Sequence, residues 1–275
     1  MTFIFDILKT IILGIIQGIT EWLPISSTGH LILFNGIWSM SMEPEVFEVF
    51  KVVIQFGSIL AVLVLYFRKL NPWAKGKSQA KQKETFRLWK NVIIGCIPAG
   101  IAGVLLDDVI EGYLSAYYVI AITLILYGII FILMSKHPKK PTIKRLNDLT
   151  PKDSLKIGCF QCFALIPGTS RSGATILGGL QTGCTRYVAS EFSFFIAVPI
   201  MAGASLLKIV KFFLKGYMFT FGQVFLILLG TLISFVVSLF AIRGLLNYVR
   251  NHDFSAFGWY RIALGIVVIL FFYIF

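Results

Sequence analysis

Residues 17–30 read QGITEWLPISSTGH, and they interrupt an apolar stretch that extends over residues 3–37. Pro24 lacks a backbone donor and its ring clashes with the preceding turn, so a helix that enters this stretch must break there. A cluster of serine, threonine and glycine follows the break. Irregular backbone at membrane depth is tolerated only where protein surrounds it or where it lines a cavity. The stretch therefore predicts a re-entrant hairpin whose tip lies inside the protein.

A second stretch has the same organisation. Residues 155–182 are apolar, and PGTSRSGAT at residues 167–175 interrupts them. A shift of the chain by 144 residues superimposes the two stretches. It aligns Gly14 with Gly158, Gln17 with Gln161, Ser26 with Ser170, Thr28 with Ser172 and Gly29 with Gly173. The shared order and spacing predict a duplicated unit.

The composition indicates that the bilayer is the solvent for most of the chain. The sequence is 57% hydrophobic and only 14% charged, compared with roughly 25% charge in soluble domains. The runs 113–135 and 219–242 contain no charge, and each exceeds the roughly 20 residues that a helix needs to cross a bilayer. These runs also lack the strict alternation of membrane β-barrels. An all-α polytopic membrane protein is therefore expected.

Three predicted spans follow each predicted hairpin. The spans lie near 46–67, 91–106, 115–135, 188–210, 220–242 and 258–275. The last one is long enough only if Arg261 snorkels to the interface. We expect one membrane domain over 1–275, with repeat one at 1–135, a basic cytoplasmic linker at 136–156 and repeat two at 157–275.

The basic residues predict the topology. The net charge is +12, and fifteen of the 25 basic residues fall in the loops 68–90 and 136–156. Basic loops beside spans are cytoplasmic by the positive-inside rule, and this placement argues against a nucleic-acid partner. A hairpin returns the chain to the side from which it entered, whereas three spans take the chain to the opposite side. The second repeat therefore starts from the opposite side to the first and is inverted, and both termini lie outside. Inverted repeats with broken helices place their site where the breaks meet, near mid-membrane.

The first hairpin supplies an acid and an imidazole. Gln17 and Glu21 are four residues apart and share one helix face. A carboxylate inside a membrane is a functional candidate, although Glu21 could also cap or pair locally. Together with phosphate oxygens, the two side chains could hold Mg²⁺ or Ca²⁺. His30 could exchange a proton during a reaction, or it could be structural.

The hydroxyl groups Ser26, Ser27 and Thr28 follow the break in this hairpin. They could cap the next half-helix, or one of them could be a nucleophile activated by a nearby base.

The second hairpin predicts an anion site. Arg171 is its sole basic residue beyond Lys156, and its guanidinium fork matches phosphate. The hydroxyl groups around it belong to Thr169, Ser170, Ser172 and Thr175. A half-helix N-terminus adds a positive dipole end. The structural alternative is an ion pair between Arg171 and Glu21, which would also bring the two hairpins together.

An acid, a hydroxyl and an anion clamp at one place are what phosphoryl transfer requires. A transporter is the alternative, because inverted repeats and broken helices are also transporter features. A purely structural subunit would leave the intramembrane Glu21 and Arg171 without a role. Two further polar pairs lie outside the hairpins. Arg186 and Glu191 could simply pair at the start of a predicted span, and Glu48 and Lys51 have no assigned role.

Three motifs resemble the signatures of the undecaprenyl-pyrophosphate phosphatase family, also called the bacitracin-resistance family. The motif (Glu/Gln)-x-x-x-Glu matches residues 17–21, Leu-Pro-x-Ser-Ser-Thr-Gly-His matches 23–30, and Pro-Gly-x-Ser-Arg-Ser-x-x-Thr matches 167–175. The resemblance covers nearly the whole chain, including the spans after each hairpin.

The resemblance implies removal of the terminal phosphate from undecaprenyl pyrophosphate, with a divalent cation and a site open to the outer face of the bacterial plasma membrane. The expected catalytic residues are Glu21, Ser27, His30 and Arg171, with Ser26, Thr28, Ser170, Ser172 and Thr175 as substrate ligands and Glu21 and Gln17 as metal ligands. Many members carry glutamate where this chain has Gln17, and either Ser27 or a metal-bound water could attack. The expected partners are the prenyl pyrophosphate lipid, the membrane and a second copy of the chain in a homodimer.

Overall fold

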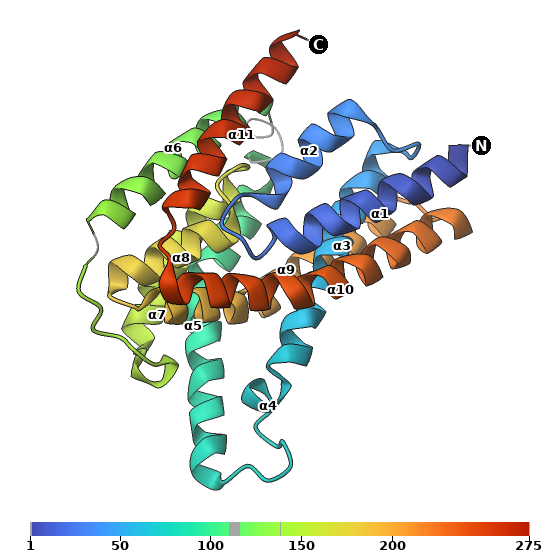
Figure 1. The fold of residues 1–275 in the computed structure, drawn as a ribbon. Coiled ribbons are helices and arrows are strands. Elements are labelled where there is room, and N and C mark those ends of the chain that lie inside the picture. Colours follow the sequence, from blue (N-terminus) through green and yellow to red (C-terminus); the bar gives the residue numbers. More distant parts are fainter. Residues whose placement is uncertain (1, 110–115, 138, 275) are drawn as a thin grey trace.

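The structure, a computed structural model, describes residues 2–109, 116–137 and 139–274 (Figure 1). These residues form a helical bundle, and the only β-contact among them is an isolated bridge between Ile143 and Cys184. The α-helices are α1 (Thr2–Thr20), α2 (Ser27–Ile37), α3 (Pro44–Leu65), α4 (Phe67–Leu70), α5 (Gln79–Val109), α6 (Tyr117–Lys136), α7 (Pro151–Cys162), α8 (Arg171–Thr182), α9 (Arg186–Leu214), α10 (Phe221–Asn251) and α11 (Ser255–Ile274). Two 3₁₀ turns, η2 (Leu146–Asp148) and η3 (Phe163–Leu165), flank α7.

Both predicted helix breaks are present. The chain turns back between α1 and α2, and again between η3 and α8 (Figure 1). Seven of the described helices are long and apolar enough to cross a membrane, and one of them is the first limb of hairpin one, Phe3–Thr20. The protein is therefore an all-helical polytopic membrane protein, as expected.

Two predicted loops are partly helical. Helix α5 begins at Gln79, within the predicted loop 68–90, because the segment QAKQKETFRLWK is rich in residues that favour helix. Helix α7 begins at Pro151, within the predicted linker 136–156. Thr150 and Asp153 form a capping box there, in which each side chain bonds to the backbone N–H of the other residue, and this box fixes the helix start.

The two halves of the chain pack in a reciprocal way. Helix α1 of the first hairpin packs against α10, and α7 of the second hairpin packs against α5. Helices α6 and α11 cross each other at Gly128 and Gly258, where a Cβ on either glycine would lie 2.7 Å from the carbonyl oxygen of the other (Figure 1). Such small residues allow membrane helices to approach closely. The packing agrees with a duplicated unit, while the inverted orientation of the repeats stays a prediction.

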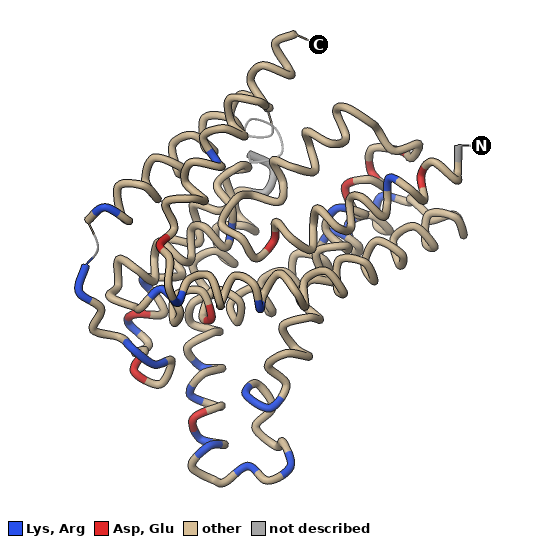
Figure 2. The backbone as a smooth tube through the Cα atoms, viewed as in Figure 1, with Lys and Arg blue, Asp and Glu red and all other residues tan. Residues whose placement is uncertain are grey.

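Lysine and arginine gather on the segment from α4 into α5 and on the linker before α7, and the two chain ends lie on the other side of the bundle (Figures 1 and 2). This arrangement is the one that the positive-inside prediction requires. The fold itself does not assign a compartment to either side, so the orientation stays a prediction.

Two expectations about charged residues are wrong. Glu191 pairs with Lys69 at 2.8 Å, while Arg186 Nη1 donates to the carbonyl oxygen of His252 at 2.9 Å. Arg186 and Glu191 lie five residues apart, and side chains at that spacing diverge around a helix. Arg261 does not snorkel, because its side chain is 0% exposed. Glu48 and Lys51 form an ion pair at 2.6 Å.

Candidate active site

The two hairpin tips share an unusual backbone geometry. Ser26 and Ser170 are the only described non-glycine residues with positive φ, at 71° and 73°. Each caps the following half-helix, since Ser26 Oγ accepts from the N–H of Gly29 at 3.3 Å and Ser170 Oγ accepts from that of Gly173 at 3.1 Å. Residues in this region cost of order 1–3 kcal/mol and persist where the surrounding structure holds them. The matching strain at equivalent positions agrees with the 144-residue correspondence.

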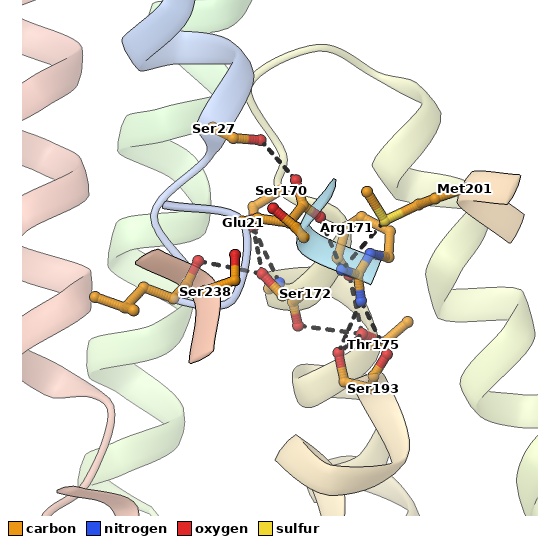
Figure 3. Close-up of polar contacts among 12 residues, drawn as sticks. Glu21, Ser27, Ser170, Arg171, Ser172, Thr175, Ser193, Met201 and Ser238 are labelled. Atoms are coloured by element: carbon orange, nitrogen blue, oxygen red, sulfur yellow. Dashed lines mark hydrogen bonds and ion pairs between the residues drawn. The ribbon is translucent and has the colours of Figure 1, made fainter. Parts of the chain in front are cut away.

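An ion pair joins the two tips. Arg171 Nη2 donates to Glu21 Oε1 at 2.8 Å, across 150 residues of sequence (Figure 3). The two side chains are 12% and 5% exposed. The expectation that the two breaks meet inside the protein is confirmed, and the structural tie between Glu21 and Arg171 is present in this state.

Glu21 also organises its own hairpin. Its Oε2 atom accepts from Gln17 Nε2 at 2.8 Å and from Ser27 Oγ at 3.1 Å (Figure 3). Three donors therefore converge on this one carboxylate. The hydroxyl of Ser27 points to a carboxylate oxygen, which is the group that could take its proton.

His30 is held in another direction. Its Nδ1 atom lies 2.7 Å from the carbonyl oxygen of Ser26, and its Nε2 atom lies 2.7 Å from the hydroxyl of Tyr260. The Tyr260 ring stacks on the imidazole at 5.6 Å. A carbonyl only accepts hydrogen bonds, so Nδ1 carries a proton and a neutral His30 accepts at Nε2. Among the described residues, no hydrogen bond joins His30 to Ser27, and its role as the proton-exchanging group stays a prediction.

The guanidinium of Arg171 is held on several sides. Nη1 donates to the backbone oxygen of Ser193 at 2.9 Å and to its hydroxyl at 3.3 Å. Thr175 Oγ1 lies 2.6 Å from the Ser193 hydroxyl and donates to the Arg171 carbonyl oxygen at 2.9 Å. The Trp22 ring lies 5.6 Å from the guanidinium carbon. Ser193 carried no signal in the sequence, since a serine in a membrane helix is unremarkable without its neighbours.

The remaining predicted ligands lie at the same junction. Ser170 and Ser172 are 3.1 Å apart through their hydroxyls, and Ser172 Oγ donates to the carbonyl oxygen of Leu23 at 3.2 Å, which is a second bond between the tips. Thr28 is half-buried beside Ser27, and its side chain has no hydrogen bond within the part of the chain that the structure describes.

Arg261, like Ser193, is a residue at this junction that the sequence did not predict. Its Nη1 atom donates to the carbonyl oxygen of Pro24 at 3.1 Å, and its Nη2 atom donates to those of Gly168 at 2.9 Å and Thr123 at 3.4 Å. Pro24 and Gly168 lie at the two helix breaks, where their carbonyl groups have no helical partner. The guanidinium of Arg261 therefore donates a hydrogen bond to one such carbonyl at each break. Buried backbone carbonyls need such partners. None of the four ion pairs between described residues includes Arg261, so its charge adds to the positive potential at the tips.

Several buried polar atoms at the tips have no partner. They are Gln17 Oε1, Trp22 Nε1, Thr169 Oγ1, Arg171 Nε and Arg261 Nε. Buried polar atoms are normally hydrogen-bonded, and a bound ligand or ion is one explanation for an exception. Most of these atoms are donors, which suits an anion.

A divalent cation fits these residues only in part. The described residues contain no cluster of three or more His, Cys, Asp or Glu side chains that could hold a metal ion. Glu21 and the unpartnered Gln17 Oε1 offer two neighbouring oxygens. Mg²⁺ accepts such an incomplete protein shell when substrate phosphates supply further oxygens, so the donor set suits a cation that enters together with a phosphate.

Fold and site together define a polytopic membrane protein with a buried site of acid, serine and arginine side chains between two broken helical hairpins. Residues 10–267 match the family model of the bacitracin resistance protein BacA. The chain belongs to the BacA family.

Curated relatives match almost end to end. An undecaprenyl-diphosphatase of Limosilactobacillus fermentum is 51% identical over 269 residues, which cover 97% of this chain and 98% of the relative. The undecaprenyl-diphosphatase of Enterococcus faecalis is 49% identical over 263 residues, or 95% of each chain. Undecaprenyl-diphosphatase 1 of Clostridioides difficile is 51% identical over 269 residues, covering 98% of this chain and 97% of the relative.

Proposed function

We propose that this chain hydrolyses undecaprenyl pyrophosphate to undecaprenyl phosphate and inorganic phosphate, and so recycles the lipid carrier of bacterial cell-wall synthesis. The names of its relatives support the substrate. The observation that carries the chemistry is the convergence of Ser27 and Arg171 on the Glu21 carboxylate at 3.1 and 2.8 Å. That arrangement supports the proposed roles of Ser27 as nucleophile, Glu21 as proton acceptor and Arg171 as anion ligand.

In the proposed reaction, Arg171 binds the pyrophosphate through its fork and through Nε, which has no partner in the free protein. Ser27 Oγ forms a bond to the terminal phosphorus while its proton passes to Glu21 Oε2. The bond from that phosphorus to the bridging oxygen breaks, and undecaprenyl phosphate leaves. Water then cleaves the phosphoserine, which releases inorganic phosphate and restores the serine hydroxyl.

The other predicted residues position these groups. His30 bonds to the carbonyl of Ser26 and thereby orients the peptide that precedes Ser27, while its exchange of a proton during the reaction stays a separate prediction. Thr175 holds the Ser193 hydroxyl against Arg171. A divalent cation, when bound, supplies positive charge against the pyrophosphate, and Glu21 and Gln17 are the residues that would hold it.

Removing the Ser27 hydroxyl tests this proposal. Purified protein in detergent, where transport is impossible, is expected to release phosphate from a prenyl pyrophosphate. A chelator should abolish the release, and Ser27→Ala should lower the rate at least about a hundredfold, because loss of a nucleophile removes the covalent route. Ser190→Ala is the matched control, because that buried hydroxyl bonds only to the carbonyl of Arg186 in its own helix, at 2.9 Å.

The other outcomes are informative. A metal-dependent rate that survives in Ser27→Ala would assign the attack to water instead of serine. No release from folded wild-type protein with any of several divalent metals would contradict the enzyme and favour a lipid-phosphate transporter.

Two further proposals concern the protein in its membrane. The basic segments 68–90 and 136–156 face the cytoplasm and the site opens to the outer face, as the positive-inside rule suggests. An impermeant thiol reagent applied to intact cells should then label Gly216→Cys, on the side away from those segments, and should not label Lys83→Cys. The reverse pattern would invert the topology. We also propose a homodimer, which light scattering of the detergent-solubilised protein would distinguish from a monomer.

A further inference from the structure

A cavity with several basic side chains in its lining lies outside the hairpin tips, at the basic end of the bundle. Its volume is about 650 Å³, and it lies between the linker after α6, the turn from α8 to α9, and the end of α10. Its charged lining consists of Lys139, Lys144, Arg186, Arg250 and Asp253. We call this cavity the linker pocket. The proposed phosphatase chemistry makes no use of it.

Backbone hydrogen bonds fix the part of the linker that borders the linker pocket. The N–H groups of Thr142 and Ile143 donate to the carbonyl oxygen of Gly183 at 2.9 Å, and the N–H of Thr185 donates to that of Ile143 at 3.0 Å. Gly183 has φ of 99°, and a Cβ there would lie 2.6 Å from Thr142 Oγ1. Glycine is the residue that accepts both conditions. The linker is therefore docked onto the turn before α9, and the lysines that it carries stand beside the arginines of α9 and α10.

The charges of the linker pocket are strongly unbalanced. Arg186 is held by the carbonyl of His252 at 2.9 Å, and the guanidinium of Arg250 lies 5.4 Å from the Tyr187 ring. Lys139 and Lys144 are exposed and form no ion pair within the described residues. A hydrogen bond from the Ser255 N–H, helped by the charge of Arg186, lowers the pKa of Asp253, which is therefore ionised at neutral pH. Four cations and one carboxylate leave a net charge of +3 in the lining.

The position of the linker pocket suits a lipid headgroup. Its lining includes the apolar side chains of Met134, Leu180, Val249 and Phe254. It lies where the membrane helices α6 and α10 end, at Lys136 and Asn251. A ligand with a phosphate among the basic side chains could place its first carbons on this apolar surface. Basic pockets between membrane helices are known binding places for anionic headgroups.

We propose that the linker pocket binds a phosphate group at a site separate from the Glu21–Arg171 pair. A dianionic phosphate neutralises most of the +3 lining, and a docked linker with two restrained arginines pre-organises the site for it. The phosphate can come from a membrane lipid or from free phosphate.

The test measures binding in an uncharged detergent, with dihexanoyl phosphatidic acid as the lipid probe and inorganic phosphate as the free probe. Titration calorimetry is performed on the wild type, on Lys139→Glu/Lys144→Glu, and on Lys152→Glu/Lys156→Glu as the matched control. The control pair changes the net charge equally and lies on the same basic end, at exposed positions outside the pocket lining.

We expect the pocket variant to bind at least roughly tenfold more weakly, since each basic residue near an anionic headgroup contributes to its affinity, and the control to bind like the wild type. Weakening with phosphatidic acid alone assigns the site to a lipid headgroup, and weakening with both probes assigns it to phosphate itself. Equal weakening in both variants, or no difference between either variant and the wild type, would overturn the proposal. The readout is binding, so it stands whether or not the mid-membrane site hydrolyses pyrophosphate.

Discussion

Arg171→Lys is expected to lower phosphate release by on the order of a hundredfold or more, the usual effect of losing a donor that stabilises transition-state charge. A lysine keeps the charge but concentrates it on one nitrogen, so it cannot reproduce the planar fork that contacts Ser193 and Glu21 from two nitrogens or present that fork to phosphate. The rate should be measured at saturating substrate in detergent, after the folded state has been checked by thermal unfolding.

Arg243→Lys is the matched control, because that arginine lies exposed on α10. It should leave the rate unchanged. Near-normal turnover in a folded Arg171→Lys protein would contradict the proposed role of Arg171 in binding phosphate.

Arg261→Met is expected to lower both stability and activity. Methionine is apolar and similar in length, but it leaves the carbonyls of Pro24, Gly168 and Thr123 without their donor. Each buried acceptor left unpaired costs about 1–3 kcal/mol. Methionine also removes the desolvation penalty of the buried guanidinium, which offsets part of this cost. We expect a clear fall in the thermal unfolding midpoint and near-complete loss of phosphate release.

Arg261→Lys separates positioning from stability. A lysine can satisfy some of the carbonyls but cannot span both tips with a planar fork. We therefore expect a small fall in the unfolding midpoint and a reduced rate at a temperature where the variant is fully folded. A methionine variant with wild-type midpoint and wild-type rate would contradict the role assigned to Arg261.

Some of the site followed directly from local sequence. Pro24 and Pro167 signalled the two breaks, because proline lacks a donor and clashes with the preceding turn, and because Ser, Thr and Gly follow each of them. Proline alone does not break a helix in this protein, since Pro98 and Pro199 lie inside α5 and α9. The charge-free runs predict spans because an apolar helix of sufficient length is what crosses the bilayer. Glu21 and Arg171 stood out for the same reason, since an ionisable group within an apolar run is costly and needs a partner or a function.

Other parts of the site had no local signal. Arg261 was interpreted as a snorkelling interface residue, although its partners are carbonyl groups 237 and 93 residues away. Every residue has a carbonyl, so no side-chain pattern marks the ones that it binds. The pairing of Glu191 with Lys69 was missed similarly, because Arg186 is closer in sequence but lies on another face of the helix.

The sequence by itself determined the helical membrane class, the two broken stretches, their internal correspondence and most of the residues that gather at the tips, because proline breaks, hydrophobic length and buried charge act locally. Tertiary structure decided which groups touch. In the folded protein the Ser27 hydroxyl bonds to Glu21, His30 bonds to Tyr260, and Arg261 bonds to both hairpin tips. These contacts depend on how helices that are distant in sequence cross one another. Glycine residues at the crossings let the helices approach closely, and the crossings form only when the whole bundle packs.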